Sequence, residues 1–251
     1  MKRVATALIL IPFIVWIALW APEWAFDLVL AASGLIAFYE FERIAGLGRL
    51  PMALGTAAGL ALLFEPEPFW VVLIAAFAAM TLSLASRDFH HALSGAAVLV
   101  LGVLYIFGAW RCAVGLRAFN PHWLMIALLV SWAGDTAALY VGRAFGRRKL
   151  APSISPGKTW EGSAASVIGG MLAAGLYAHF LIPSFPMAGV LAIAAAANIA
   201  GQIGDLCESA FKRGGGVKDS GSTLPGHGGW LDRMDSLLFA IPTTYAMLKL
   251  L

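Results

Sequence analysis

The chain has 251 residues, of which 60% are hydrophobic and only 12% are charged, and its mean hydropathy is +0.82. A soluble domain carries about 25% charged residues, so this composition excludes a soluble globular protein and predicts an integral membrane protein. The net charge of +3 excludes little by itself, because the placement of the charges along the chain carries more information.

Apolar runs predict about nine membrane-spanning helices and no large soluble domain, since a span needs about 20 mostly apolar residues. The expected fold class is therefore all-α, a polytopic helical bundle in a membrane. Residues 20–23, after the first apolar run, form a poor signal-peptide cleavage site, so we interpret that run as the first span. The expected spans are residues 4–20, 24–40, 52–64, 69–86, 92–110, 123–142, 161–182, 187–208 and 236–250.

The N-terminal half contains few groups that suggest chemistry. Glu40 and Glu42 fall at the expected end of the second span, where we expect solvated carboxylates. We treat residues 1–110 as an N-terminal transmembrane region. Residues 111–251 then form a C-terminal region that carries the reactive groups on two polar loops, 143–160 and 209–235.

An aspartate inside the sixth span begins the first chemically informative stretch. Asp135 lies within the apolar run 123–142. A charge in the bilayer is costly and indicates a functional site by default. The alternative is a structural hydrogen bond from this side chain to a neighbouring helix.

The basic loop after this span ends in S-P-G-K-T-W-E-G. A P-loop is excluded, because Pro152 replaces the first glycine of the pattern G-x-x-x-x-G-K-[ST] and no strand precedes it. We expect Ser155, Lys158 and Thr159 to bind phosphate at the start of the next helix, where free N–H groups favour anions. A helix cap with Glu161 in the first turn is compatible with this role.

The most polar stretch of the chain runs from residue 205 to residue 235. Its carboxylates alternate with Lys and Arg, and its glycines allow a ligand to approach the backbone closely. Carboxylates hold a hard cation such as Mg2+, and the cation and the basic groups neutralise phosphate oxygens. A solvated loop between two spans is the alternative interpretation. The ionisable residues of the stretch are Asp205, Glu208, Lys212, Arg213, Lys218, Asp219, His227, Asp232, Arg233 and Asp235.

The segment 209–235 reads S-A-F-K-R-G-G-G-V-K-D-S-G-S-T-L-P-G-H-G-G-W-L-D-R-M-D. It resembles the signature of the phosphatidate cytidylyltransferase family: a Ser, then K-R, then K-D, and finally H-G-G-x-x-D-R-x-D. All of these positions match, whereas Gly214 stands where an acidic or polar residue is expected. The block at 155–162 resembles the second conserved block of the same family.

The resemblance implies transfer of CMP from CTP to phosphatidic acid, giving CDP-diacylglycerol and pyrophosphate. The expected cofactor is Mg2+, with or without a second cation. The attacking phosphate is already an anion, so no Ser or Cys nucleophile is needed. The candidate metal ligands are Asp219, Asp232 and Asp235, with Asp205 and Asp135 as further carboxylates. The other candidate catalytic or phosphate-binding residues are Lys212, Arg213, Lys218, Arg233, Ser155, Lys158, Thr159, Ser209 and His227.

Charge placement predicts the orientation of the protein. With the N-terminus in the cytoplasm, all of the 17 Lys and Arg residues except Arg111, Arg117 and Lys249 lie on the cytoplasmic side. We expect a bacterial inner (plasma) membrane protein whose two loops converge at the cytoplasmic headgroup level, with Lys158 close to the Asp219 region. The expected partners are CTP, phosphatidic acid and membrane lipid, but no nucleic acid, and a homodimer is left open.

Two other classes of function compete with this interpretation. A CTP-dependent polyisoprenol or phytol kinase would transfer the γ-phosphate instead of CMP. A transporter would place acidic groups along a path through the bilayer, whereas here the charge is concentrated in one loop. A CDP-alcohol phosphotransferase is disfavoured, because its D-G-x-x-A-R block is absent from the sequence.

Overall fold

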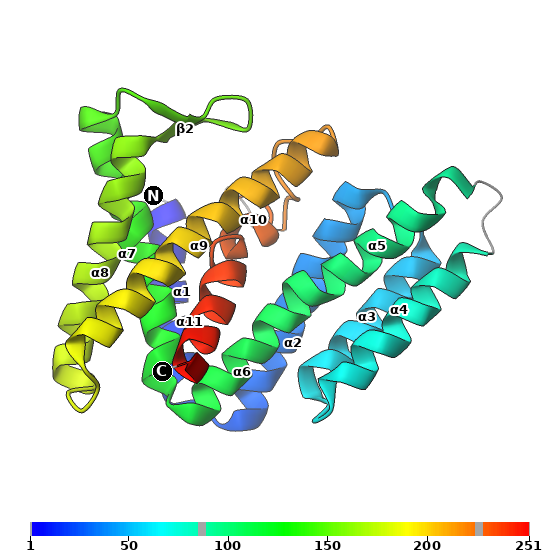
Figure 1. The fold of residues 1–251 in the computed structure, drawn as a ribbon, viewed down its shortest axis with the longest axis horizontal. Coiled ribbons are helices and arrows are strands. Elements are labelled where there is room, and N and C mark those ends of the chain that lie inside the picture. The colour runs from blue at the N-terminus through cyan, green and yellow to red at the C-terminus, as the bar shows by residue number, and fades with distance from the viewer. Residues whose placement is uncertain (1, 85–88, 224–227, 251) are drawn as a thin grey trace.

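The computed structural model describes residues 2–84, 89–223 and 228–250, with side chains from residue 10 onwards. The described chain is almost entirely helical, and successive long helices run in alternating directions (Figure 1). The helices are α1 (Lys2–Leu19), α2 (Glu23–Ala45), α3 (Arg49–Phe64), α4 (Pro68–Ser83), α5 (Ala92–Val103), α6 (Ala109–Phe119), α7 (Pro121–Phe145), α8 (Trp160–Leu181), α9 (Met187–Gly214), α10 (Leu231–Met234) and α11 (Leu237–Leu250). A 3-10 turn, η1 (Phe89–His91), precedes α5, and a π-helical turn, η2 (Leu104–Gly108), joins α5 to α6.

The prediction of an all-α membrane protein is confirmed. Among the described residues, five helices are long and apolar enough to cross a membrane. They are Glu23–Ala45, Phe89–Phe119, Pro121–Phe145, Trp160–Leu181 and Met187–Gly214. Helices α3 and α4 have 16 residues each and α11 has 14, so the expected spans at these places are short.

Local sequence explains where several helices begin and end. Asn120 caps α7, because its side chain accepts a hydrogen bond from the His122 N–H at 3.0 Å, and Pro121 occupies the first helical position. Helix α2 ends at Gly46, whose φ of 71° lies in the left-handed region that glycine adopts without strain.

Several boundaries differ from the predicted ones, and two of these differences are informative. The fifth span was expected to end at residue 110, but the helical run continues to Phe119 and includes Arg111 and Arg117. Arg111 Nη1 donates to the Leu62 carbonyl at 3.1 Å, and Arg117 donates to the Ala21 carbonyl. These arginines thus satisfy free carbonyl groups at other helix ends from within a continuing helix. The proposed division at residue 110 falls within this run and stays a prediction.

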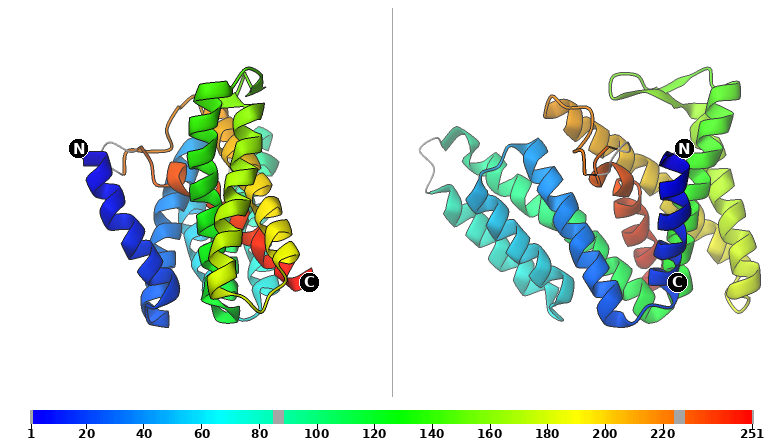
Figure 2. Two further views of the ribbon diagram at one scale, coloured as in Figure 1. Left: turned by 90° about the vertical axis from the view of Figure 1, so that its left-hand side faces the viewer. Right: turned by 180° about the vertical axis from the view of Figure 1, so that it is seen from behind.

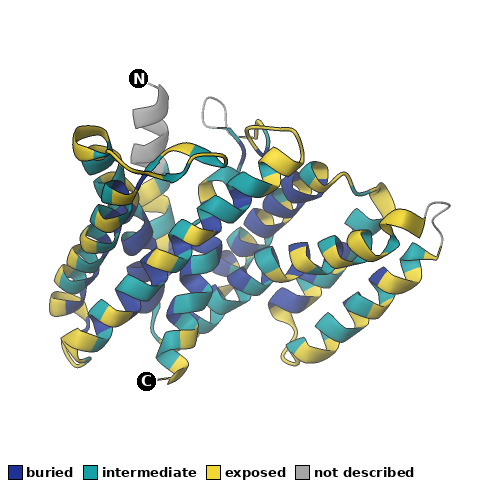
Figure 3. Ribbon diagram, turned by 45° about the horizontal axis from the view of Figure 1, so that its top comes forward, coloured by how far each residue is buried: buried dark blue, intermediate teal, exposed yellow. Residues whose placement is uncertain are grey.

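The second boundary error concerns the end of α2, which extends to Ala45 instead of residue 40. The expectation that Glu40 and Glu42 are solvated is wrong, because each is only 1% exposed. Figure 3 shows the general pattern, with buried residues on inward faces and exposed residues on the outer faces of the peripheral helices. Glu40 and Glu42 are therefore part of the protein interior.

The helices that carry the polar stretches lie side by side. Helices α7 and α8 form an antiparallel pair at one side of the molecule, α3 and α4 form another at the far side, and α9 and α11 lie between them (Figures 1 and 2). Asn198 of α9 joins α7 and α8, since its Nδ2 donates to the Val130 carbonyl and to Ser166 Oγ, both at 3.2 Å. A Cβ on Gly134 would lie 2.3 Å from Asn198 Nδ2, so this close packing requires glycine there.

The connections fall into two groups at opposite ends of the molecule. The N-terminus, the connection after α7 and the C-terminal end of α9 lie at one end, and the C-terminus and the α8–α9 turn lie at the other (Figure 1). The predicted loops 143–160 and 209–235 are therefore at the same end.

Candidate active site

The loop after α7 is an antiparallel hairpin, so the expectation that no strand precedes Gly157 is wrong, although Pro152 still excludes the P-loop pattern. Its strands are β1 (Lys149–Ala151) and β2 (Ser155–Thr159), with Lys149 opposite Thr159. The expected helix cap is confirmed, because Thr159 Oγ1 accepts a hydrogen bond from the Gly162 N–H at 3.1 Å. Glu161 accepts from the backbone N–H groups of Arg147 and Arg148, which ties the base of the hairpin to α8. The capped end of α8 thus holds Lys158 in a fixed place.

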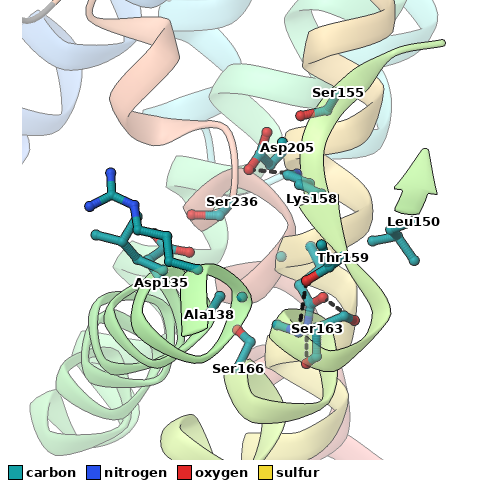
Figure 4. Close-up of a pocket in the computed structure, with 17 residues that line it drawn as sticks. Asp135, Ala138, Leu150, Ser155, Lys158, Thr159, Ser163, Ser166, Asp205 and Ser236 are labelled. Carbon is teal, nitrogen blue, oxygen red and sulfur yellow. Dashed lines mark hydrogen bonds and ion pairs between the residues drawn. The ribbon is translucent and has the colours of Figure 1, made fainter. Parts of the chain in front are cut away.

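An ion pair joins the hairpin to the polar stretch on α9. Lys158 Nζ lies 2.7 Å from Asp205 Oδ2, and Figure 4 shows the two side chains pointing toward each other. The hairpin also projects toward the C-terminal end of α9 (Figures 1 and 2). Lys158 of the loop 143–160 therefore meets Asp205, which precedes the loop 209–235 on α9. Convergence of the two loops themselves and proximity of Lys158 to Asp219 stay predictions.

Beneath the hairpin is a cavity of about 530 Å³, which we name the polar cavity. Its walls come from α7, the hairpin, α8 and α9, and it contains several hydroxyl and charged groups (Figure 4). Five candidate residues from the sequence line it, together with groups that sequence reasoning did not select. Its polar lining residues are Asp135, Arg143, Ser155, Lys158, Thr159, Ser163, Ser166, Gln202, Asp205 and Ser236.

A second cavity, of about 360 Å³, lies between α1, α2, α7 and α11, and we name it the apolar cavity. Most of its lining is aliphatic or aromatic, for example Ile14, Leu30 and Trp132. Among the described residues, charged groups occur in its lining only at Asp135 and in the 232–235 segment. Asp135 and Ser236 line both cavities, so the two spaces adjoin at these residues.

Asp235 lies near this junction, between α10 and α11. Burial raises the pKa of its carboxyl well above the usual range, and the negative charges of Asp205, Glu208 and Asp135 raise that pKa further. Its Oδ1 accepts a hydrogen bond from the Ser236 N–H at 2.6 Å, and this bond lowers the pKa by a smaller amount. The carboxylates thus repel one another, and a bound cation would relieve that repulsion.

Lys212 lies in the interior between two carboxylates. Its Nζ is 2.5 Å from Glu208 Oε2 and 2.6 Å from Asp232 Oδ1. Asp232 also accepts from the backbone N–H of Ser220 at 3.1 Å and of Gly229 at 2.8 Å. Burial alone would raise the pKa of Asp232, but Lys212 and these N–H groups outweigh it and hold the pKa below its usual range. These contacts give Lys212 and Asp232 a role in holding the signature segment.

The other candidates in the signature segment are spread over the surface. The side chains of Arg213, Lys218, Asp219 and Arg233 are exposed, and Arg233 also lines the apolar cavity. Ser209 Oγ donates to Asp205 Oδ1 at 3.4 Å, so these two share a face of α9 as expected. The proposed role of His227 falls outside the described residues. The structure thus gathers Asp135, Lys158, Asp205 and Asp235 near one junction and leaves Asp219 and Lys218 on the loop surface.

Sequence reasoning missed Glu40, which lies on α2 and binds the signature segment. Oε2 accepts from Ser220 Oγ at 2.7 Å and from the Leu231 N–H at 2.8 Å. Oε1 accepts from Thr223 Oγ1 at 2.5 Å and from the Trp230 N–H at 3.0 Å. Only its charge at the end of an apolar run marked Glu40 in the sequence, and that position equally suits a solvated residue.

Comparisons with known proteins show the family of the chain. The sequence model of the cytidylyltransferase family matches residues 1–251. The chain is 36% identical over 277 aligned positions to a phosphatidate cytidylyltransferase of Pseudomonas aeruginosa, covering 98% of this chain and 96% of the relative. It is 34% identical over 243 positions to one of Bacillus subtilis, covering 90% and 89%. A match to one of Haemophilus influenzae is 45% identical over 123 positions and covers 47% and 43%. The chain belongs to the cytidylyltransferase family.

Proposed function

We propose that this protein is a phosphatidate cytidylyltransferase, which transfers CMP from CTP to phosphatidic acid and releases pyrophosphate. The observation that carries the proposal is the junction of the polar and apolar cavities at Asp135 and Ser236. A water-soluble nucleotide and a membrane lipid require two such adjoining environments. The relatives that align with nearly the whole chain bear the name of this activity.

The polar cavity suits the triphosphate of CTP. Lys158 and Arg143 supply positive charge, and Ser155 and Ser163 supply hydroxyl groups that donate to phosphate oxygens. The N-terminus of α8 opens at Thr159, where the helix dipole also favours an anion. Lys158 is bound to Asp205 in the structure, so an arriving phosphate would share this lysine with the carboxylate.

The apolar cavity suits the acyl part of phosphatidic acid. Burial of each CH2 group contributes about 0.8 kcal/mol, so a lipid stays in an apolar environment while its phosphate reaches polar groups. Arg233 lines this cavity close to the junction and is suited to bind the lipid phosphate. The lipid and the nucleotide then approach the junction from different sides.

In the proposed reaction, a phosphate oxygen of phosphatidic acid attacks the α-phosphorus of CTP. A new P–O bond forms as the bond from the α-phosphorus to the bridging oxygen of the β-phosphate breaks, and pyrophosphate leaves with that electron pair. No covalent enzyme intermediate is needed, so the catalytic task is to bring two anions together and neutralise their charge. The protein contributes to this neutralisation through the positive charges of Lys158, Arg143 and Arg233.

We include Mg2+ in the proposal. Among the residues that the structure describes, no three His, Cys, Asp or Glu side chains form a ready-made metal site. Mg2+ commonly takes only one or two carboxylates and completes its shell with waters and substrate phosphates. The mutually repelling Asp205 and Asp235, with Asp135 beside them, fit this requirement. Bound Mg2+ would neutralise phosphate oxygens, and Asp219 and Asp232 stay further candidate ligands.

We further propose that the site faces the cytoplasm of a bacterial inner membrane. The hairpin, the N-terminus and the C-terminal end of α9 share one end of the molecule, and most Lys and Arg residues belong to this end. The positive-inside rule assigns such an end to the cytoplasm, where CTP is available. The relatives named above come from bacteria.

Labelled CTP tests the proposal. Purified protein in mixed micelles with phosphatidic acid and Mg2+ is given CTP that carries 32P at either the α or the γ position. We expect α-label in the organic phase as CDP-diacylglycerol and γ-label in water as pyrophosphate. Entry of γ-label into the lipid would instead show a kinase, and no label in the lipid would contradict the proposed activity.

A further inference from the structure

The carboxylate of Glu40 connects two parts of the chain that are far apart in sequence. Among the described residues, Glu40 accepts four hydrogen bonds, two at each oxygen, and all of them come from the signature segment, from Ser220, Thr223, Trp230 and Leu231. We name these four residues and Glu40 the anchor cluster. With Glu40 only 1% exposed, its charge is satisfied by these donors instead of water.

Two glycines of the signature segment lie directly against this carboxylate. A Cβ on Gly221 would lie 2.6 Å from Glu40 Oε1, and a Cβ on Gly229 would lie 2.5 Å from Glu40 Oε2. A side chain at either position would therefore force Glu40 or the backbone of the segment to shift. A second contact lies beside it, because Trp230 Nε1 donates to Ser33 Oγ, also on α2, at 2.8 Å.

The anchor cluster is bonded directly to the charged groups described above. Ser220 Oγ donates to Glu40 and accepts from the Asp232 N–H at 3.3 Å, while the Ser220 N–H donates to the Asp232 carboxylate. Asp232 in turn binds Lys212. Leu231 is the first residue of α10, and Asp235 directly follows the end of this helix. Fixing Leu231 therefore also fixes the position of Asp235 at the cavity junction.

We propose that Glu40 is a positioning residue for the cytidylyltransferase reaction, which holds the signature segment so that Asp232 and Asp235 keep their places. The proposal rests on the proposed function and adds a residue of the N-terminal half to the machinery of the site. Glu40 lines neither cavity, so it acts through the segment and not on the substrates.

The chain supplies a matched control on the same helix. Glu42 is also 1% exposed, but among the described residues its two oxygens have no hydrogen-bond partner. Glu42→Gln therefore changes a buried carboxylate to an amide without touching the signature segment. In Glu40→Gln, one oxygen becomes an NH2 group, and whichever way the amide turns, the N–H of Trp230 or Leu231 loses its acceptor.

Hydrogen exchange measures the anchoring without any assay of activity. Purified wild type, Glu40→Gln and Glu42→Gln are compared by mass spectrometry of peptides that cover residues 228–236. We expect exchange in Glu40→Gln to be about tenfold faster than in wild type, because the amides of Trp230 and Leu231 lose protection. Glu42→Gln should exchange as wild type does. Equal exchange in the two variants would overturn the proposal.

Steady-state kinetics then test the link to the reaction. We expect kcat of Glu40→Gln to fall by about 10- to 100-fold while KM for CTP changes by less than about threefold, since a displaced segment misaligns the reacting groups. Glu40→Asp keeps both acceptor oxygens and should recover part of kcat. Adding Ser220→Ala to Glu40→Gln should lower kcat little further, because the two residues share one hydrogen bond. Adding Ser220→Ala to Glu42→Gln should lower kcat by the same factor as in wild type.

The outcomes separate this proposal from the proposed function. A loss of kcat in Glu40→Gln with unchanged exchange would show that Glu40 acts on the chemistry itself, and would overturn a positioning role. If the wild type transfers no CMP, the proposed function fails, whereas the exchange comparison still decides whether Glu40 anchors the segment. If Glu40→Gln cannot be purified, Ser220→Ala and Thr223→Val replace it in the exchange experiment.

Discussion

At the scale of single residues, Asp235 is costly to bury and is therefore informative. It is partly buried near the negative charges of Asp205 and Glu208, and its burial and these charges both raise the pKa of its carboxyl. A protein that keeps such a carboxylate sacrifices stability, because an uncompensated buried charge is unfavourable. The arrangement is understandable if a cation and substrate phosphates complete the site.

The first prediction concerns Asp235→Asn. We expect CMP transfer to fall by at least about 100-fold, because a carboxylate at the reacting centre is lost. We also expect the melting temperature without Mg2+ to stay the same or rise, because the repulsion from Asp205 and Glu208 disappears. Near-normal activity at saturating Mg2+ would remove Asp235 from the site. Glu67→Gln, an exposed change outside both cavities, is the control for handling of the protein.

Asp219→Asn is a separate test, because Asp219 lies on the exposed surface of the signature segment. The family resemblance predicts the same loss of turnover for this variant. Its carboxylate is close to Gly228, where an added Cβ would lie 3.9 Å from Asp219 Oδ1. Normal CMP transfer by a folded Asp219→Asn protein would restrict the proposed metal ligands to the carboxylates at the cavity junction.

Lys158 supports a prediction that separates the two substrates. Its ammonium group lines the polar cavity and not the apolar one, so Lys158→Ala should raise KM for CTP by about tenfold while KM for phosphatidic acid changes little. Lys149→Ala removes an exposed lysine of the same hairpin outside both cavities and should leave both values unchanged. A larger effect on phosphatidic acid than on CTP would reverse our assignment of the cavities.

At the scale of structural elements, the turn before α10 depends on a glycine. A Cβ on Gly229 would lie 1.9 Å from Ser220 Oγ, so Gly229→Ala should displace the segment, destabilise the protein by about 1–3 kcal/mol and reduce kcat. A Cβ on Gly214 would meet nothing within 4 Å, so Gly214→Ala should keep stability and kcat close to the wild-type values. Melting in detergent and the labelled-CTP assay measure the two effects. An active and stable Gly229→Ala protein would contradict the described packing.

The same elements show how far sequence reasoning reaches. The helices and the cap at Thr159 follow from local patterns, and the topology that hydropathy implies places both polar loops at one end of the molecule. The contact of Lys158 with Asp205 was not predicted, because Lys158 was expected near Asp219. The end of α2 was placed too early, because a hydropathy pattern treats Glu40 as the end of an apolar run. Its partners lie 180 or more positions away in the chain, and only the tertiary structure brings their donors to it.

At the scale of the whole molecule, the orientation can be tested with thiol reagents. In a protein whose Cys112 and Cys207 are replaced, we expect Ser222→Cys to react with an impermeant maleimide only in inside-out vesicles. Ser184→Cys, in the α8–α9 turn at the opposite end, should react only from the outer face. The reverse pattern would place the polar cavity outside the cell and separate it from its supply of CTP.

With the two substrates in the cavities as we propose, the adjoining cavities also determine where the two products go. Pyrophosphate can leave through the polar cavity into water, while CDP-diacylglycerol can return through the apolar cavity to the lipid leaflet without crossing an aqueous phase. Each product therefore retraces the route of one substrate. Product inhibition should accordingly divide along the same line, with pyrophosphate competing against CTP and CDP-diacylglycerol competing against phosphatidic acid.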